Sequence, residues 1–404
     1  MLEKSENKNN CCSPQKPFPE FEPKKILPMV TPQKEEVEVC CGPKLAPPSS
    51  PFEKPGYRIC DFVEGFIPTA NGPVPRIKTD LTWRDRRGTI GVRLGLNRNN
   101  YKVSPGLYAL GHPDSDSVVL ITANYKLSFD ALRKELAGLN AWILVLDTRG
   151  VNVWCAAGKK TFSSEEVIRQ TKRNLLDQIV SHKKLILPQL SATGVSALEV
   201  KRGCGFEVIW GPIQARDIKP FLAAGFRAEK AMRQVSFRFF ERLVLTPVEI
   251  ILVLKYLLWI VPLMLVLSGI GPRIFSISDL WHRGLPASLA VVFGIISGAV
   301  LTPAFLPWIP FRAFSVKGAI IGGVVGLTLI GLFFHPVVFL PALALVLLTI
   351  TLSSYMAMNF TGCTPFTSPS GVEKEMRKAI PLQSAAALLG LILWVGSAFI
   401  QPAS

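Results

Sequence analysis

The chain has 404 residues, a formal net charge of +16 and a composition that is 49% hydrophobic. The positive charge does not indicate nucleic-acid binding, because no basic stripe interleaved with aromatic residues accompanies it. Most of the charge precedes Leu245 and an apolar C-terminal part follows, as expected of a membrane protein with a charged cytoplasmic domain.

Residues 1–55 form a tail rich in Pro, Lys and Glu, which we expect to be disordered. The tail has no apolar stretch of a signal peptide, so we expect it in the reducing cytoplasm. Its vicinal pairs Cys11-Cys12 and Cys40-Cys41 either handle a soft metal ion such as mercury or are incidental thiols. No CxxC pair occurs among the eight cysteines, so no iron–sulfur cluster is expected in this chain.

Residues 56–245 are expected to form a globular α/β domain with a β-rich N-terminal part. Within that part, segments 76–83 and 88–94 are expected to pair as a hairpin across the turn Asp85-Arg-Arg-Gly88.

Further along the domain, short apolar strands alternate with helices. One helix is expected to begin at Ser128, and another at Ser163, which has capping-box spacing to Glu166. The alternation predicts a doubly wound, Rossmann-like parallel sheet, whose ligands bind at the carboxyl ends of the strands. The strands are expected at 117–122, 141–147, 185–187 and 206–210.

The most informative segment is the octet 152–159, Asn-Val-Trp-Cys-Ala-Ala-Gly-Lys. It follows the strand at 141–147 and precedes the helix at Ser163, so Cys155 is expected just beyond the carboxyl end of a strand. Neither a GxGxxG motif after the first strand nor a P-loop is present, so a dinucleotide or nucleoside triphosphate is not favoured.

The octet resembles the signature of the corrinoid protein of the mercury-methylation pair, the HgcA family. The resemblance extends from about Pro51 onward and includes 105–108, 119–130 and 187–190. The soluble part is also similar to the corrinoid-binding domain of the corrinoid iron–sulfur protein large subunit of acetyl-CoA synthesis. This chain lacks the cysteine-rich cluster domain of that relative and adds membrane spans.

The resemblance implies a membrane-anchored corrinoid-dependent methyltransferase that transfers a methyl group from methyl-cobalt to Hg(II) to form methylmercury. The cofactor would be cobalamin in its base-off form, with the Cys155 thiolate as catalytic group and cobalt ligand. The implied partners are a small ferredoxin with two [4Fe–4S] clusters and a methyl donor linked to methyltetrahydrofolate. The alternative is a corrinoid methyl carrier of one-carbon metabolism, similar to that of the acetyl-CoA pathway.

Several candidate residues allow two interpretations. Trp154 either shields the cobalt face or fills the core, and Asn152 either caps the helix or contacts the cofactor. Gly158 either allows a close approach or ends the short helix. The expected cofactor-binding residues are Thr122, Asn124, Asn152, Val153, Trp154, Cys155, Ala156, Ala157, Gly158, Lys159, Gln189, Gly194 and Gly211.

Residues 246–404 are expected to form a transmembrane domain of five helices, each near or above the ~20 residues needed to cross a bilayer. Lys and Arg in the short loops predict a multi-pass protein of the cytoplasmic membrane, with the N-terminal domain inside and the C-terminus outside. Gly318, Gly322 and Gly326 are expected to let another helix approach closely. The spans are expected at 248–270, 285–308, 315–334, 336–358 and 380–401.

The loop 359–376 is rich in small hydroxyl residues. It either faces the soluble domain or a partner, or is an ordered connection to a surface helix near Ser370. Cys363 within it is either a ligand for a soft metal ion or simply a small side chain.

Overall fold

The computed structural model describes residues 45–50, 53–56, 60–333, 338–364, 367 and 369–400. The vicinal cysteine pairs of the tail, the turn at His335 and the side chain of Cys363 lie outside the described residues. The expectations for them therefore stay predictions.

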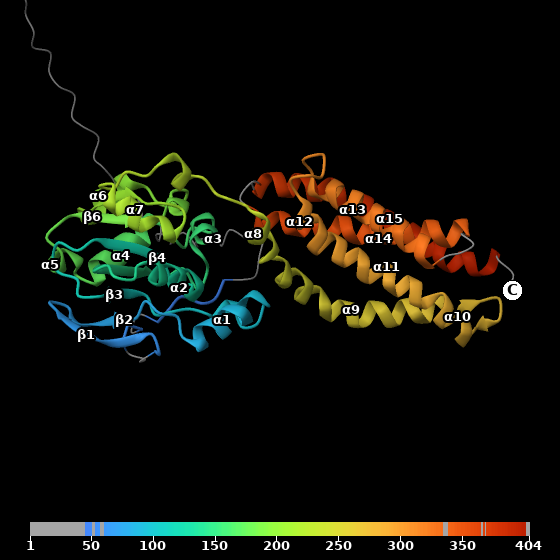
Figure 1. The fold of residues 1–404 in the computed structure, drawn as a ribbon, viewed down its shortest axis with the longest axis horizontal. Coiled ribbons are helices and arrows are strands. Elements are labelled where there is room, and N and C mark those ends of the chain that lie inside the picture. Colours follow the sequence, from blue (N-terminus) through green and yellow to red (C-terminus); the bar gives the residue numbers. More distant parts are fainter. Residues whose placement is uncertain are drawn as a thin grey trace, which may run out of the picture. The chain divides into compact units, whose positions relative to one another are not determined.

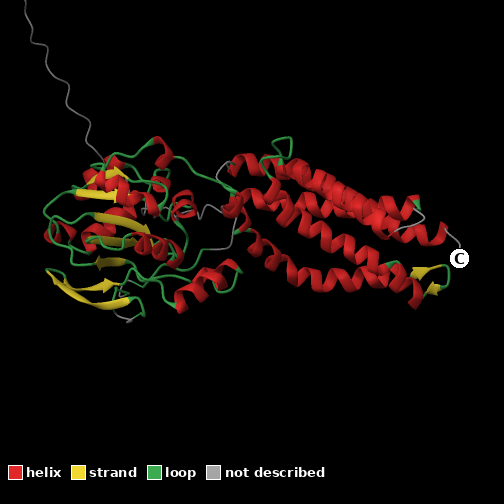
Figure 2. Cartoon of the chain, in the orientation of Figure 1, coloured by secondary structure: helices red, strands yellow, loops and turns green. Residues whose placement is uncertain are grey.

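The α/β domain is built on a seven-stranded sheet with the strand order β1-β2-β3-β5-β4-β6-β7 (Figures 1 and 2). Its four strands β5, β4, β6 and β7 run parallel, whereas β3 runs antiparallel to β5. The four strands expected in the alternating part are all present and parallel, as predicted. The β-rich N-terminal part adds β1, β2 and β3 to the same sheet and makes it mixed, which the sequence did not predict. The strands are β1 (Val63–Thr69), β2 (Gly72–Ile77), β3 (Gly106–Leu110), β4 (Val119–Ala123), β5 (Ala141–Leu146), β6 (Lys184–Leu187) and β7 (Glu207–Trp210).

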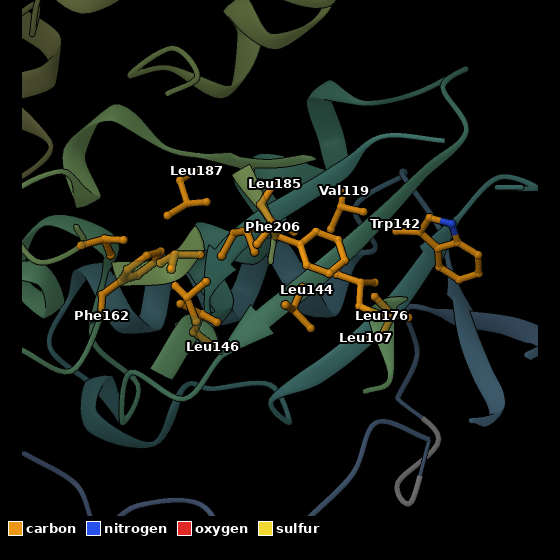
Figure 3. Packing of buried hydrophobic residues seen from close by; sticks show 14 of the residues in the cluster. Leu107, Val119, Trp142, Leu144, Leu146, Phe162, Leu176, Leu185, Leu187 and Phe206 are labelled. Atoms are coloured by element: carbon orange, nitrogen blue, oxygen red, sulfur yellow. The ribbon is translucent and has the colours of Figure 1, made fainter. Parts of the chain in front are cut away.

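Two hydrophobic cores lie on the two faces of this sheet. One contains Leu144, Phe162 and Phe206 and packs the sheet against α4 and α6 (Figure 3). The other contains Phe129 and Phe221 and packs the sheet against α2 and α7. Because the central strands bury both faces, they read in sequence as continuous apolar runs. The helices are α2 (Lys126–Glu135), α3 (Val153–Gly158), α4 (Ser164–Arg173), α5 (Leu176–Ile179), α6 (Ala197–Cys204) and α7 (Ile218–Ala223).

The segment expected to form a hairpin at Asp85 is instead the helix α1 (Trp83–Arg93), so that prediction is wrong. Thr82 Oγ1 accepts a hydrogen bond from Asp85 N at 3.3 Å, and Asp85 Oδ2 accepts one from Thr82 N at 3.0 Å. This reciprocal capping box starts a helix where a turn was expected. The hairpin of the domain is formed by β1 and β2, which pair antiparallel.

The C-terminal part is helical. Five stretches of the described residues are long and apolar enough to cross a membrane, as expected: Phe239–Ser268, Ile277–Phe305, Phe314–Leu332, Phe339–Asn359 and Gly371–Ile400. The helices that form them are α8 (Phe239–Leu243), α9 (Thr246–Ser268), α10 (Ile277–His282), α11 (Gly284–Ile296), α12 (Thr302–Phe305), α13 (Phe314–Phe333), α14 (Phe339–Asn359) and α15 (Pro369–Ile400), with a π-helical segment, Ser297–Leu301, between α11 and α12 (Figure 1).

The glycines of α13 lie where α13 packs against α14. A Cβ added to Gly322 would lie 2.6 Å from Ser353 Cβ and 2.9 Å from Ile350 Cα. One added to Gly326 would lie 3.3 Å from Val346 Cα. The expected close helix approach is therefore confirmed.

Candidate functional site

The site lies where the sheet changes its direction of winding. From β4 the chain crosses to β5 on one side, and from β5 it returns past β4 to β6 on the other side. Open α/β sheets bind ligands at such a switch point, at the carboxyl ends of the strands. A cleft of about 370 Å³ lies there, which we call the strand-end cleft. It is lined by Leu120, Ile121, Thr122, Ser128, Ala131, Leu132, Asn152, Val153, Trp154, Ile186, Leu187, Pro188, Leu190, Gly211, Pro212, Ile213, Ala215 and Ile218.

Five of the expected cofactor-binding residues line this cleft together. Thr122 lies at the end of β4, and Gly211 follows β7 directly. A Cβ added to Gly211 would lie 3.1 Å from Ile186 Cγ2, so a larger residue would push against the cleft wall. Asn152, Val153 and Trp154 come from the start of α3.

Cys155 follows these three residues in the first turn of α3 and is half-buried. Its backbone nitrogen donates to Asn152 Oδ1 at 2.9 Å, so Asn152 is the N-cap of α3 as well as a lining residue. The octet therefore lies just beyond the carboxyl end of β5, as the sequence predicted. Cys155 is not engaged in a disulfide.

The remaining octet residues complete α3 and pack it against the core of the domain. Ala156 and Ala157 are buried and belong to the core on the α4 face of the sheet. Gly158 is the last residue of α3, and a Cβ added there would meet open space, so it ends the helix without a close approach. Lys159 is the C-cap, with its backbone nitrogen donating to Cys155 O.

Asn124, an expected cofactor contact, is fully buried and does not line the cleft. Its Oδ1 accepts hydrogen bonds from Thr148 N at 3.2 Å and Gly150 N at 2.9 Å. Its Nδ2 donates to Asp147 Oδ1 at 3.0 Å. Asn124 thus holds the loop that leads from β5 to α3, and we assign it a positioning role.

Two further expected contacts also support the site from outside the cleft. Gln189 Oε1 accepts a hydrogen bond from Arg233, and its side chain does not line the cleft. A Cβ added to Gly194 would lie 2.9 Å from Ala157 Cα and would also collide with Phe162 O. Gly194 therefore lets the loop after β6 pack directly against α3.

Several lining residues were not foreseen from the sequence. Ser128 was expected to cap a helix, but α2 begins at Lys126 with Tyr125 as N-cap, so that prediction is wrong. Ser128 instead lies in the first turn of α2 and lines the cleft. The segment after β7 lines the cleft with Ile213, Ala215 and Ile218, whereas the sequence had pointed only to Gly211 in this segment.

A buried ion network joins α1 to α2. Asp85 bonds Lys126 Nζ at 2.6 Å and Arg133 Nη2 at 2.7 Å, and Asp130 bonds the same two cations. Burial alone would raise the pKa of Asp85, but hydrogen bonds from Lys126 and Thr82 and the two positive charges outweigh it and lower this pKa from 3.8 to about 2. The carboxyl of Asp85 is therefore ionised at neutral pH.

Tyr125 directly precedes Lys126 of this network and is buried. Burial raises the pKa of the Tyr125 hydroxyl, and negative charge on Cys155 acts in the same direction, against Arg98 and Arg93. The phenol is therefore neutral over the physiological range.

The described residues do not form a metal site made of protein ligands alone. Among them, no three His, Cys, Asp or Glu side chains gather as a ligand set. Cys155 is a single soft thiol beside a largely apolar cleft. This arrangement fits a metal that brings its other ligands in a macrocycle, with one further ligand from the protein.

The comparisons with known proteins concern the α/β domain. Residues 96–222 match the family of the CO dehydrogenase/acetyl-CoA synthase delta subunit (CdhD). The gamma subunit of the acetyl-CoA decarbonylase/synthase complex of Archaeoglobus fulgidus is 35% identical over 142 residues, 33% of this chain and 29% of that subunit. The corresponding subunit of Methanopyrus kandleri is 30% identical over 127 residues, 31% of this chain and 27% of that subunit.

The chain thus spans less than a third of the length of these relatives. The similarity supports the expected relation of the α/β domain to subunits of the acetyl-CoA synthesis system. The membrane helices, which begin after residue 238, lie outside the segment that matches the family.

Proposed function

We propose that this protein is a membrane-anchored corrinoid protein that carries and transfers a methyl group, with Cys155 as the protein ligand to cobalt. The observation that carries the proposal is the position of Cys155, half-buried in α3 directly after three residues that line the strand-end cleft. The similarity to acetyl-CoA decarbonylase/synthase subunits supports the class of cofactor.

Different lining residues of the cleft would orient the cofactor and exclude water from it. Thr122, Ser128 and Asn152 supply the polar groups of an otherwise apolar cleft, so they would orient the cofactor. Trp154 and Leu190 would exclude water from it. A bound corrinoid would supply a cobalt centre able to take up and release a methyl group.

Cys155 would act from the protein side of the cobalt. A thiolate is a strong electron donor to a soft metal, so it would favour the oxidised metal and departure of the methyl group with its bonding electrons. The cap from Asn152 to Cys155 N fixes the start of α3 and therefore the direction of approach of the sulfur.

Two classes of methyl acceptor fit this arrangement. The relatives favour a carrier of one-carbon metabolism that delivers methyl to a protein or cofactor. The cysteine-containing octet favours the second acceptor, Hg(II), because a thiolate ligand promotes release of methyl to a soft electrophile. With Hg(II) as acceptor, a separate ferredoxin with two [4Fe–4S] clusters would restore the reduced cofactor before a methyltetrahydrofolate-linked donor methylates it again.

The test is an optical spectrum of the purified full chain loaded with cobalamin. We expect a cobalt–thiolate spectrum in the wild type that disappears in Cys155→Ala. Cys204→Ala is the matched control, because Cys204 is equally half-buried but lies at the end of α6. A Cys155→Ala spectrum identical to that of the wild type would refute the ligand assignment, and failure of the wild type to retain cobalamin would refute the cofactor.

The acceptor is decided by a second assay on the loaded, methylated protein. Release of methylmercury on addition of Hg(II), dependent on Cys155, would support mercury methylation. Methyl transfer to tetrahydrofolate or to an acetyl-CoA synthase, without methylmercury, would support the one-carbon carrier.

A further inference from the structure

The outer face of α1 is an unusual surface for a soluble domain. Trp83 and Ile90 are 68% and 55% exposed, and Leu96, just beyond the helix, is 61% exposed. Trp83 and Ile90 are seven residues apart, so they lie within about 20° of each other on one face of the helix. Leu96 N donates to Gly91 O at 2.8 Å, which turns the chain back against the helix end.

Arginines flank this apolar face on both sides. Residues 83–98 contain five arginines and one acidic residue. The acidic residue, Asp85, points the other way into the buried network with Lys126 and Arg133. By helical periodicity, Arg86 and Arg93 border the apolar face on one side, and Arg84 and Arg87 border it on the other.

We propose that this arginine-flanked face, with Trp83, Ile90 and Leu96 at its centre, binds the anionic headgroup surface of the membrane that the chain's own helices span. Tryptophan and arginine at the edge of an apolar strip are the side chains that suit the membrane–water interface. The arginines pair with lipid phosphates while their alkyl chains and the strip enter the interface.

Charge and connectivity select the lipid surface as occupant. Arg84 Nη1 pairs with the exposed Asp61 Oδ2 at 2.9 Å, whereas no ion pair is formed within the described residues by Arg86, Arg87 or Arg93. The face therefore keeps a net positive charge, and a second copy of the same face would be repelled. An acidic soluble protein would satisfy the arginines but would leave the exposed strip without an apolar partner. The first membrane-crossing helix begins directly after the domain, at Phe239, so the bilayer is always present at high effective concentration.

The proposal does not depend on the corrinoid assignment, because it uses neither Cys155 nor the strand-end cleft. Its consequence is that lipid charge controls how the domain is held at the membrane. The attachment of this face to the membrane should weaken as salt is added, because the attraction between each arginine and an anionic surface is screened within a Debye length.

The test uses the full chain in nanodiscs made of phosphatidylcholine alone or of equal parts phosphatidylcholine and phosphatidylglycerol. The variant Ile90→Cys is labelled with N-ethylmaleimide, and the rate at residue 90 is read by peptide mass spectrometry. We expect labelling to slow by about tenfold in the anionic discs, with recovery in the added double substitution Arg86→Glu/Arg87→Glu. Leu198→Cys is the matched control, because Leu198 is 57% exposed, close to the 55% of Ile90, but lies on α6 and not on the arginine-flanked face. It should be labelled at the same rate in both discs.

A second charge control is Lys201→Glu/Arg202→Glu on α6, which removes the same charge from a helix without this face and should leave the slowing at residue 90 unchanged. Equal rates at residue 90 in the two discs would overturn the proposal. So would slowing that persists in Arg86→Glu/Arg87→Glu, or equal protection by added polyglutamate in neutral discs, since an acidic protein would then be the better occupant.

Discussion

The positioning of Cys155 depends on Asn124, a residue that lies outside the cleft. Asn124→Ala removes the Oδ1 acceptor and leaves Thr148 N and Gly150 N buried without it. Each unsatisfied buried donor costs about 1–3 kcal/mol, so the substitution should cost about 2–6 kcal/mol. This is a large share of the roughly 5–15 kcal/mol that stabilises a typical domain. For a domain of this size we expect a fall in Tm of roughly 10 °C.

The assay combines thermal unfolding of the detergent-solubilised full chain with hydrogen exchange of the peptide 147–152. Asn124→Ala should exchange faster in this loop and should weaken the cobalt–thiolate spectrum of the loaded protein. Asn124→Asp keeps the Oδ1 acceptor but replaces the Nδ2 donor with a carboxylate oxygen facing Asp147 Oδ1, so it should stay destabilised. For the thermal unfolding alone, Asn152→Ala is a comparison variant that should lower Tm less, since it loses one cap hydrogen bond and about 1 kcal/mol. Asn124→Ala with wild-type Tm and loop exchange would refute the reasoning.

Three further predictions follow from other parts of the chain. The pKa of Asp85 is lowered from 3.8 to about 2, so its carboxylate contributes stability that is complete above pH 3.8 and is lost as the pH falls toward 2. The variant Asp85→Asn should be less stable at pH 7, and its acid unfolding, followed by circular dichroism, should lack this pH-dependent loss. Gly322→Val should reduce the folded yield and Tm in detergent because its side chain would collide with Ser353 and Ile350, whereas Gly396→Val, which meets open space, should not; equal yields would contradict this packing argument. A reporter fused after Ser404 should read as extracytoplasmic and one inserted within 366–372 as cytoplasmic, and the reverse pattern would place the α/β domain outside.

The strands of the parallel core were predictable because their sequences bury both faces. The run Ala141–Leu146 is apolar throughout and became the central strand β5, with every residue buried. The pairing partners were not predictable in the same way. The antiparallel placement of β3 beside β5 depends on contacts between residues far apart in sequence, such as Tyr108 with Ile143.

The error at α1 shows how a turn-like segment misleads a pattern analysis. The hairpin was expected because Asp85-Arg-Arg-Gly88 resembles a turn between the segments 76–83 and 88–94. The capping box of Thr82 and Asp85 was the signal that could have corrected this. Trp83 and Ile90 on this helix face solvent, whereas the charged Asp85 faces inward beside Val92, so at these positions the usual assignment of core and surface is reversed.

The site itself was predictable where the strand-end rule applies and unpredictable where packing decides. Thr122 and Gly211 line the cleft because they lie at strand ends. Asn124 lies only two residues beyond Thr122, yet it turns away into the loop before α3. The local sequence does not show which of Thr122 and Asn124 lines the cleft and which binds the loop, since both are polar residues at the end of the same strand.

The octet is therefore held in place mainly by residues that do not belong to the cleft. Asn124 fixes the loop before α3, and Gly194 lets the loop after β6 pack against Ala157. A short helix of six residues has little stability of its own, so the position of Cys155 must come from these contacts. A larger residue at position 194 should displace α3 and change the spectrum of the loaded protein without touching the sulfur. Such a result would show that the approach of the thiolate to the cofactor is set by backbone packing around the octet and not by the octet alone.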